Sequence, residues 1–190
     1  MSTFRMPTKS DLKSRTSTIS NAFVISITPW ISPNDEEITG FYEKFKVSEG
    51  QCAYCLQHGA NSVDHYRGLV INSEPSGYTT DIGNLVPCCP KCNSSKGNKT
   101  FEEWYDDDRT KERLRQLGMT DDQISERRRI IVNAMQGVDR FDFKSIIGEE
   151  KWNEFIERRQ KLNDLLRENQ LFCDELSKEI TEFVRQEKMK

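Results

Sequence analysis

The sequence predicts a helix-rich α+β protein built around a small core that is rich in metal ligands. Two Cys-x-x-Cys pairs, at 52–55 and 89–92, enclose two short strand-like stretches. After about residue 100, helix-capping patterns and helical periodicity take over. A chain of 190 residues can hold one domain with extensions or two small domains. We therefore expect a compact α+β core with helical extensions on both sides.

The composition is that of a soluble protein, with 35% hydrophobic and 31% charged residues. No apolar run is long enough to span a bilayer, and the first residues lack a signal-peptide pattern. We expect a cytoplasmic protein with no membrane partner. The formal net charge of −3 is unusual for a protein that coats itself in nucleic acid. Contacts with phosphate would therefore come from local basic clusters.

The first 46 residues predict an arm followed by a short structured segment. Residues 1–20 are rich in Ser, Thr and Lys, which predicts a mobile basic arm. Over 21–46 we expect one strand and one helix, with the strand in the apolar run 22–27. Ser32 as N-cap, Pro33 in the first turn and three acidic residues after it predict where the helix begins.

Residues 47–105 are expected to carry the chemistry. The stretches 62–66 and 84–88 predict two short strands, and the Pro and Gly residues between them predict a long loop over 67–83. After Pro90 the chain is expected to form a short helix. The order is therefore strand, loop, strand, helix.

Four cysteines at this spacing predict a closed, tetrahedral and therefore structural zinc site. In a reducing compartment the paired spacing favours metal over disulfides, although the pairs could also be redox-active or merely buried. Zinc binding would supply folding energy to a segment with little hydrophobic core. The ligands are Cys52, Cys55, Cys89 and Cys92.

Two other side chains near these pairs compete as ligands. Cys88 abuts the second pair, but only Cys89 keeps the two-residue spacing with Cys92. His58 is expected at the surface or beside the ligands. Cys88 and Cys173 are expected to be ordinary buried thiols.

A second set of residues carries a family resemblance. Asp64 and His65 are followed by the run from Gly83 to Asn93, which contains Asn84-Leu and Cys-Pro-Lys-Cys-Asn, and then by Lys96-Gly. This order resembles the HNH endonucleases of the ββα-metal fold, in the version with a zinc knuckle. The resemblance covers about a third of the chain. The spacer 67–83 is longer than the compact family form.

The resemblance implies a role for each motif residue. His65 would be the general base, and Asp64 and Asn93 would supply oxygen ligands to one divalent cation. Asn84 would support the loop and the orientation of His65. Carboxylate and amide oxygens suit Mg²⁺ or Mn²⁺ rather than a second zinc. Taken alone, an Asp-His pair in a strand is more often a structural pair than a catalytic one.

Basic residues outside these roles are candidates for DNA phosphate contacts. Lys96 and Lys99 follow the second cysteine pair, and Arg127 and Arg128 belong to a basic run. Each of these charges could equally belong to a solvated surface.

Residues 106–190 predict a helical region for DNA reading and dimerisation. Thr100 and Thr120 begin capping boxes. From 149 onward the chain has no Pro or Gly, and apolar residues recur at a period of about 3.5 residues. This stripe either packs on the chain's own core or forms a dimer seam. It comprises Trp152, Phe155, Ile156, Leu162, Leu165, Leu166, Phe172, Leu176, Ile180 and Phe183.

Together these patterns predict a metal-dependent endonuclease that hydrolyses phosphodiester bonds in double-stranded DNA as a homodimer. A sequence-specific type II restriction enzyme in phage defence fits a chain without a recognisable ATPase or methyltransferase. A homing or phage-type nicking enzyme would share every catalytic residue. A zinc module that binds nucleic acid without cleaving it would keep only the cysteines.

Overall fold

A computed structural model describes residues 11–189 of the chain. Residues 1–10, half of the predicted basic arm, lie outside this range. The chain divides into two compact units: a central unit of residues 27–142, and a terminal unit formed by the residues up to 26 together with those from 143 onward. The predicted functional division at 20, 46 and 105 stays a prediction.

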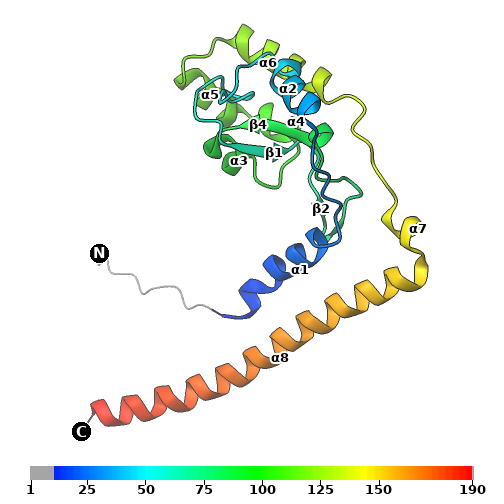
Figure 1. The fold of residues 1–190 in the computed structure, drawn as a ribbon. Helices are drawn as coiled ribbons and strands as arrows, with labels where there is room; N and C mark the ends of the chain where they lie inside the picture. Colours follow the sequence, from blue (N-terminus) through cyan, green and yellow to red (C-terminus); the bar gives the residue numbers. More distant parts are fainter. Residues whose placement is uncertain (1–10, 190) are drawn as a thin grey trace. The chain divides into compact units, whose positions relative to one another are not determined.

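The central unit contains the predicted order of strand, loop, strand and helix (Figure 1). Strand β1 (Ser62–His65) pairs antiparallel with β4 (Leu85–Cys88), with Asp64 opposite Val86. Helix α3 (Pro90–Lys96) follows directly. The helix-rich α+β class is confirmed, and both strands lie within one residue of their predicted bounds.

The long loop between β1 and β4 has structure of its own. It contains the antiparallel pair β2 (Val70–Ile71) and β3 (Glu74–Pro75). A single 3₁₀ turn, η2 (Ile82–Asn84), leads into β4, and the Asp81 carboxylate caps it by accepting from the Gly83 amide at 2.7 Å. The two ends of the loop are therefore locally fixed.

Four further helices belong to the central unit: α2 (Asp35–Lys44), α4 (Phe101–Tyr105), α5 (Asp108–Gln116) and α6 (Asp121–Ala134). Helices α4 and α6 begin at the capping boxes predicted for Thr100 and Thr120. The predicted cap of α2 is wrong by two residues, because Asn34 rather than Ser32 accepts the Glu37 amide, at 2.9 Å.

The core of the central unit is an aromatic cluster that packs against the cysteine segment. Tyr54 meets Trp104 edge-on at 4.9 Å between ring centroids, and Phe101 stacks on Tyr105 at 5.0 Å. Phe101 and Tyr105 are four residues apart, so they lie on one face of α4. All four rings are buried. The cysteine segment therefore has a fuller core than predicted, because the helices after it supply the apolar side chains.

The terminal unit is helical, and the predicted strand over 22–27 is wrong. A 3₁₀ turn η1 (Lys13–Arg15) leads into helix α1 (Thr16–Ile25). Ser20 and Val24, four residues apart, are both buried, which is the spacing of one helix face. The apolar run therefore packs as a helix against another helix.

Helix α1 packs on the long helix α8 (Glu149–Lys188), which follows the short helix α7 (Phe143–Ile147). The rings of Phe23 and Phe155 lie 5.0 Å apart, and the Ser20 hydroxyl lies 3.0 to 3.2 Å from the side-chain amide of Asn163. The prediction of a long helix after Gly148 is confirmed. Among residues 11–189, no helix is long and apolar enough to cross a membrane.

Candidate functional site

The four paired cysteines form one cluster. The sulfur atoms of Cys52, Cys55, Cys89 and Cys92 all lie within 4.8 Å of one another. The Cys55 and Cys89 sulfurs are 3.9 Å apart. Four thiolates around a zinc ion, each at about 2.3 Å, would lie about 3.8 Å apart. The donor set and its spacing therefore fit a tetrahedral zinc ion.

Backbone contacts bring the two cysteine pairs together. The Leu56 amide donates to the Cys52 carbonyl at 2.9 Å, which closes the first pair into a tight turn. The Ala53 amide inside this turn donates to the Pro87 carbonyl on β4 at 2.8 Å. Strand β4 then runs directly into Cys89, the N-cap of α3. Strand β4 therefore positions the second cysteine pair beside the first.

The thiols of the cluster perturb one another strongly. The pKa of Cys52 is lowered to about 2, because the thiols of Cys55 and then Cys92 hydrogen-bond to its thiolate. The same contact with Cys52 raises the pKa of Cys55 to about 12, and contact with Cys52 also raises the pKa of Cys92. All four groups can be thiolates together only around a cation, so metal binding must release protons.

The competing ligands lie outside the cluster. Cys88 is buried with its sulfur 3.5 Å from the Ser62 hydroxyl, and burial raises its pKa to about 12. His58 is exposed and is not part of the four-residue cluster. The expectation that Cys173 is buried is wrong, because it lies exposed on α8.

Asp64 points into the protein from β1. Its side chain is only 6% exposed, and its carboxylate accepts the Tyr54 hydroxyl at 2.6 Å. The Lys96 ammonium lies 3.1 Å from both carboxylate oxygens and also donates to the His65 carbonyl at 2.9 Å. Lys96 is 3% exposed. The predicted phosphate contact does not fit Lys96, because its ammonium group is buried in an ion pair with Asp64.

His65 points to the other face of β1, since successive strand side chains alternate. It is half-buried, and its Nε2 lies 3.0 Å from the Thr80 hydroxyl. Burial lowers the pKa of His65 below its usual value of 6.5, although the negative charge of Asp64 opposes this shift. The imidazole is therefore neutral at pH 7 and able to accept a proton.

Asn84 holds the loop that positions Thr80. Its fully buried amide nitrogen donates to the Arg67 and Thr79 carbonyls, both at 3.0 Å. Its carbonyl oxygen accepts the Arg67 amide at 2.9 Å. The Asn84 side chain thus links Arg67, at the start of the loop, to Thr79, which directly precedes Thr80. This geometry suits the supporting role expected of Asn84.

Thr80 is a site residue that the sequence did not reveal. The Thr80 amide donates to the Pro29 carbonyl at 2.9 Å, and its carbonyl accepts the Ile31 amide at 2.8 Å. Between them, Trp30 forms a parallel β-bridge with Thr80 and is 79% exposed. A threonine in a loop matches no motif, so only the folded chain shows its contact with His65.

Asn93 lies in the first turn of α3, partly exposed. Its amide nitrogen donates to the Val63 carbonyl on β1 at 3.2 Å, which leaves the amide oxygen as the atom for a cation. Together with the contacts of Asp64, His65 and Asn84, this bond gathers the four predicted motif residues around β1.

The other residues predicted to contact DNA differ in how far they are exposed. Lys99 is exposed. Arg127 is 4% exposed and donates to the Ala53 carbonyl at 3.0 Å, so it cannot reach DNA as predicted. Arg128 is partly exposed, but its guanidinium forms two 2.7 Å bonds to the Asp106 carboxylate. Of the basic run, Arg127 is therefore used inside the fold, and Arg128 is paired with a carboxylate at the surface.

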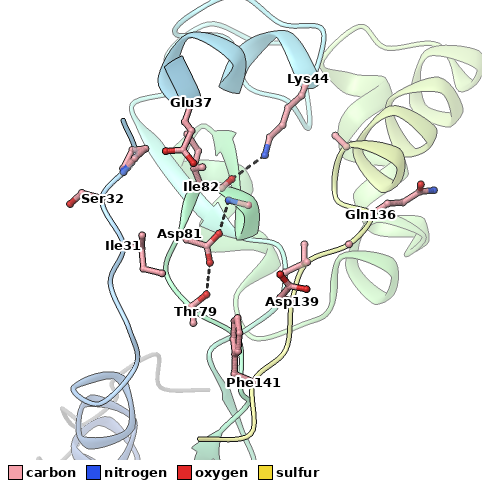
Figure 2. A pocket seen from close by; sticks show the side chains of 15 residues that line it. Ile31, Ser32, Glu37, Lys44, Thr79, Asp81, Ile82, Gln136, Asp139 and Phe141 are labelled. Atoms are coloured by element: carbon pink, nitrogen blue, oxygen red, sulfur yellow. Dashed lines mark hydrogen bonds between the residues drawn. The ribbon is translucent and has the colours of Figure 1, made fainter. Parts of the chain in front are cut away.

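A pocket of about 430 Å³ lies beside the loop that holds Thr80 (Figure 2). Its lining includes the acidic residues Glu37, Asp81 and Asp139. Lys44, the cationic residue of this lining, donates to the Ile82 carbonyl at 3.0 Å. A cavity with this balance of charge does not suit a phosphate backbone. It borders the site without forming a substrate channel.

Residues 52–99 match the HNH endonuclease family. A stretch of the chain is 38% identical over 64 residues to the "SPbeta prophage-derived putative HNH endonuclease YoqL" of Bacillus subtilis (strain 168). This match covers 29% of the chain and 26% of the relative, so the chain spans about a quarter of that protein. No solved structure matches the chain significantly. The central unit therefore carries a segment that is similar to HNH endonucleases and contains a four-cysteine cluster.

The buried ion pair gives a stability prediction. Replacing Lys96 by Met leaves Asp64 buried with an uncompensated charge, which should lower the free energy of unfolding by about 3–5 kcal/mol. Lys99→Met removes an exposed charge three residues away and should change it by less than about 0.5 kcal/mol. Urea titrations of the zinc-loaded proteins provide the measurement. Equal stability of the two variants would contradict the buried pair.

Proposed function

We propose that this protein is a metal-dependent endonuclease that cleaves double-stranded DNA. One observation carries the proposal: within a segment that matches the HNH endonucleases, a half-buried histidine with a lowered pKa is held in a fixed orientation. Among the described residues, the ring has a hydrogen-bond partner at Nε2, and none is seen at Nδ1. These properties are those of a general base that operates near neutral pH.

The base in this proposal is Nδ1 of His65. In the tautomer that we propose, Nε2 donates to the Thr80 hydroxyl 3.0 Å away, and the lone pair of the neutral ring lies on Nδ1. Nδ1 takes a proton from water as the water attacks phosphorus. Asn84 contributes indirectly, because it fixes Thr79 and thereby the position of Thr80.

The divalent cation in this proposal is Mg²⁺ or Mn²⁺, with Asn93 and Asp64 as its protein ligands. When bound, such a cation neutralises charge on the scissile phosphate and on the leaving oxygen. The amide oxygen of Asn93 is available at the surface of α3. Both oxygens of Asp64 are held by Lys96, so Asp64 can bind a cation only if the ammonium moves away. We therefore expect Asn93 to dominate cation binding.

We further propose that the four cysteines hold a structural zinc ion. Four thiolates leave no open coordination position, so this ion would take no part in hydrolysis. Its role is to join the first cysteine turn to the start of α3. The sheet that carries His65 is anchored between these two points.

More specifically, we propose that the endonuclease is a homodimeric restriction enzyme that acts in phage defence. Part of the predicted stripe on α8 lies exposed, which favours a seam between two copies over complete packing within one chain. Two active sites related by a two-fold axis would cut both strands of a palindromic target. The exposed stripe consists of Leu162, Leu165, Phe172, Leu176, Ile180 and Phe183.

The origin of the matched relative favours a second candidate. That relative is named as prophage-derived, which suits a phage-type nicking enzyme with the same catalytic residues. A supercoiled plasmid separates the two: a dimeric restriction enzyme produces linear DNA of defined length, whereas a nicking enzyme stops at the open circle.

Replacing His65 by Ala should reduce plasmid cleavage by about 10²–10⁴-fold, because it removes the proton acceptor. Zinc content and DNA binding should stay unchanged, since the imidazole is neither a zinc ligand nor one of the proposed DNA contacts. His58→Ala is the matched control, because His58 is exposed and outside the cluster. Cleavage by His65→Ala at the rate of the His58 variant would refute the proposed base.

The rate of cleavage should depend on pH through the neutral form of His65. Because burial lowers the pKa of His65 below 6.5, the rate should rise as pH increases through a midpoint under 6.5 and level off by pH 7. Single-turnover rates between pH 5 and 8 at saturating Mg²⁺ would show this limb. A midpoint above 6.5 would count against His65 as the titrating group.

The purified protein should contain one zinc ion per chain, and Cys89→Ser should lose it together with the fold of the central unit. The loss of one thiolate opens the shell, and zinc-binding energy is folding energy in such a site. Cys88→Ala removes the neighbouring thiol, which is not in the cluster, and should keep the zinc. Elemental analysis and circular dichroism measure both. Zinc-free but active wild-type protein would disprove the site.

The protein should form a dimer of twice 22.2 kDa in light scattering at micromolar concentration. Phe172→Glu places a charge in the proposed seam and should give monomers. Leu171→Glu is the control, because Leu171 lies off the stripe yet is 60% exposed, like Phe172 at 58%. A wild-type monomer with and without DNA would contradict the seam.

A further inference from the structure

Two arginines outside the segment that matches the HNH family reach the four-cysteine cluster. Arg113 on α5 places a terminal nitrogen, Nη2, 3.4 Å from the Cys92 sulfur. Arg127 on α6 donates from Nε to the carbonyl of Ala53, which lies between the two cysteines of the first pair, at 3.0 Å. Arg113 therefore contacts a cysteine of the second pair, and Arg127 contacts the backbone between the cysteines of the first pair.

Both guanidinium groups have polar atoms that lack a partner. Nε of Arg113 and Nη2 of Arg127 are buried and have no hydrogen-bond acceptor among the described residues. An unpaired guanidinium nitrogen inside a protein is costly, so such atoms are rare in stable folds. Two unpaired guanidinium nitrogens near the same cluster indicate that both arginines are held there by one anion.

We propose that Arg113 and Arg127 neutralise the charge of a zinc tetrathiolate. A Zn²⁺ ion with four thiolates has a net charge of −2, and two guanidinium groups supply +2. The inference rests on the proposed zinc site. With the ion, the charges of cluster and arginines sum to zero.

The other contacts of these side chains do not account for their position. The Arg113 guanidinium lies over the Trp104 ring at 5.8 Å, but this contact provides no hydrogen-bond acceptor for Nε. Arg127 is buried too deeply to meet DNA. Its hydrogen bond to the Ala53 carbonyl instead holds it against the turn that contains the first cysteine pair.

The consequence is that α5 and α6 belong to the metal site. Their arginines act on the ligands and not on the ion, so they are positioning residues. Partners of metal ligands typically change metal affinity by about 10–100-fold. The segment that matches the family would accordingly hold zinc more weakly without these helices.

Zinc release from the full-length protein tests this inference. The wild type, Arg113→Gln and Arg127→Gln are mixed with an excess of a chromogenic zinc chelator, and release is followed by absorbance. We expect release to be about 10–100-fold faster in each Gln variant. The controls are Arg115→Gln and Arg129→Gln on the same helices, whose exposed side chains pair with Asp121 and Glu126. They should release zinc at the wild-type rate.

Charge is separated from packing by Lys variants. Arg113→Lys and Arg127→Lys keep the positive charge, so they should release zinc more slowly than the matching Gln variants. If Lys and Gln variants release zinc equally fast, or if Gln variants release it at the wild-type rate, the charge-neutralisation inference is overturned. Absence of zinc from the wild type would instead overturn the underlying zinc proposal. If a Gln variant does not fold, the comparison of its Lys variant with wild type decides.

Discussion

The convergence of four cysteine sulfurs within 4.8 Å is the constraint on which the central unit depends. It joins a tight turn before β1 to the first turn of α3, two segments more than thirty residues apart in the sequence. Everything between them, including both strands and the loop that holds Thr80, is closed into one unit by this junction. Helices α4 to α6 then cover the cluster with aromatic rings and two arginines. Stability and site geometry thus have a common origin.

The alternation of side chains along β1 separates the site into two layers. Asp64 points inward to Lys96 and Tyr54, forming a buried polar anchor under the strand. His65 points to the opposite face, where Thr80 holds its ring. The inner layer fixes the strand, because a buried ion pair tolerates little displacement. The outer layer keeps a neutral imidazole accessible. In our proposal this division lets one rigid strand present a reactive group.

The sequence predicted those parts of the molecule that depend on local rules. Cysteine spacing, capping residues and turn-forming residues located the cluster, the strands β1 and β4, and the helices α3, α4, α6 and α8. The apolar run at 22–27 was misread as a strand, because its partner, α8, lies more than a hundred residues away. The contacts of His65 with Thr80 and of Arg127 with Ala53 were likewise invisible. These features depend on which residues pack together in the folded chain, and the local sequence pattern does not show this.

The central claim is that a metal ion in the cysteine cluster holds the strands and helices α5 and α6 in one cooperative unit. Hydrogen exchange with mass spectrometry, before and after removal of zinc by a chelator, tests it most directly. The account predicts that amides in β1, β4, α5 and α6 lose protection together, while those of α1 and α8 in the terminal unit keep theirs. Unchanged protection of α5 and α6 in the zinc-free protein would contradict the account.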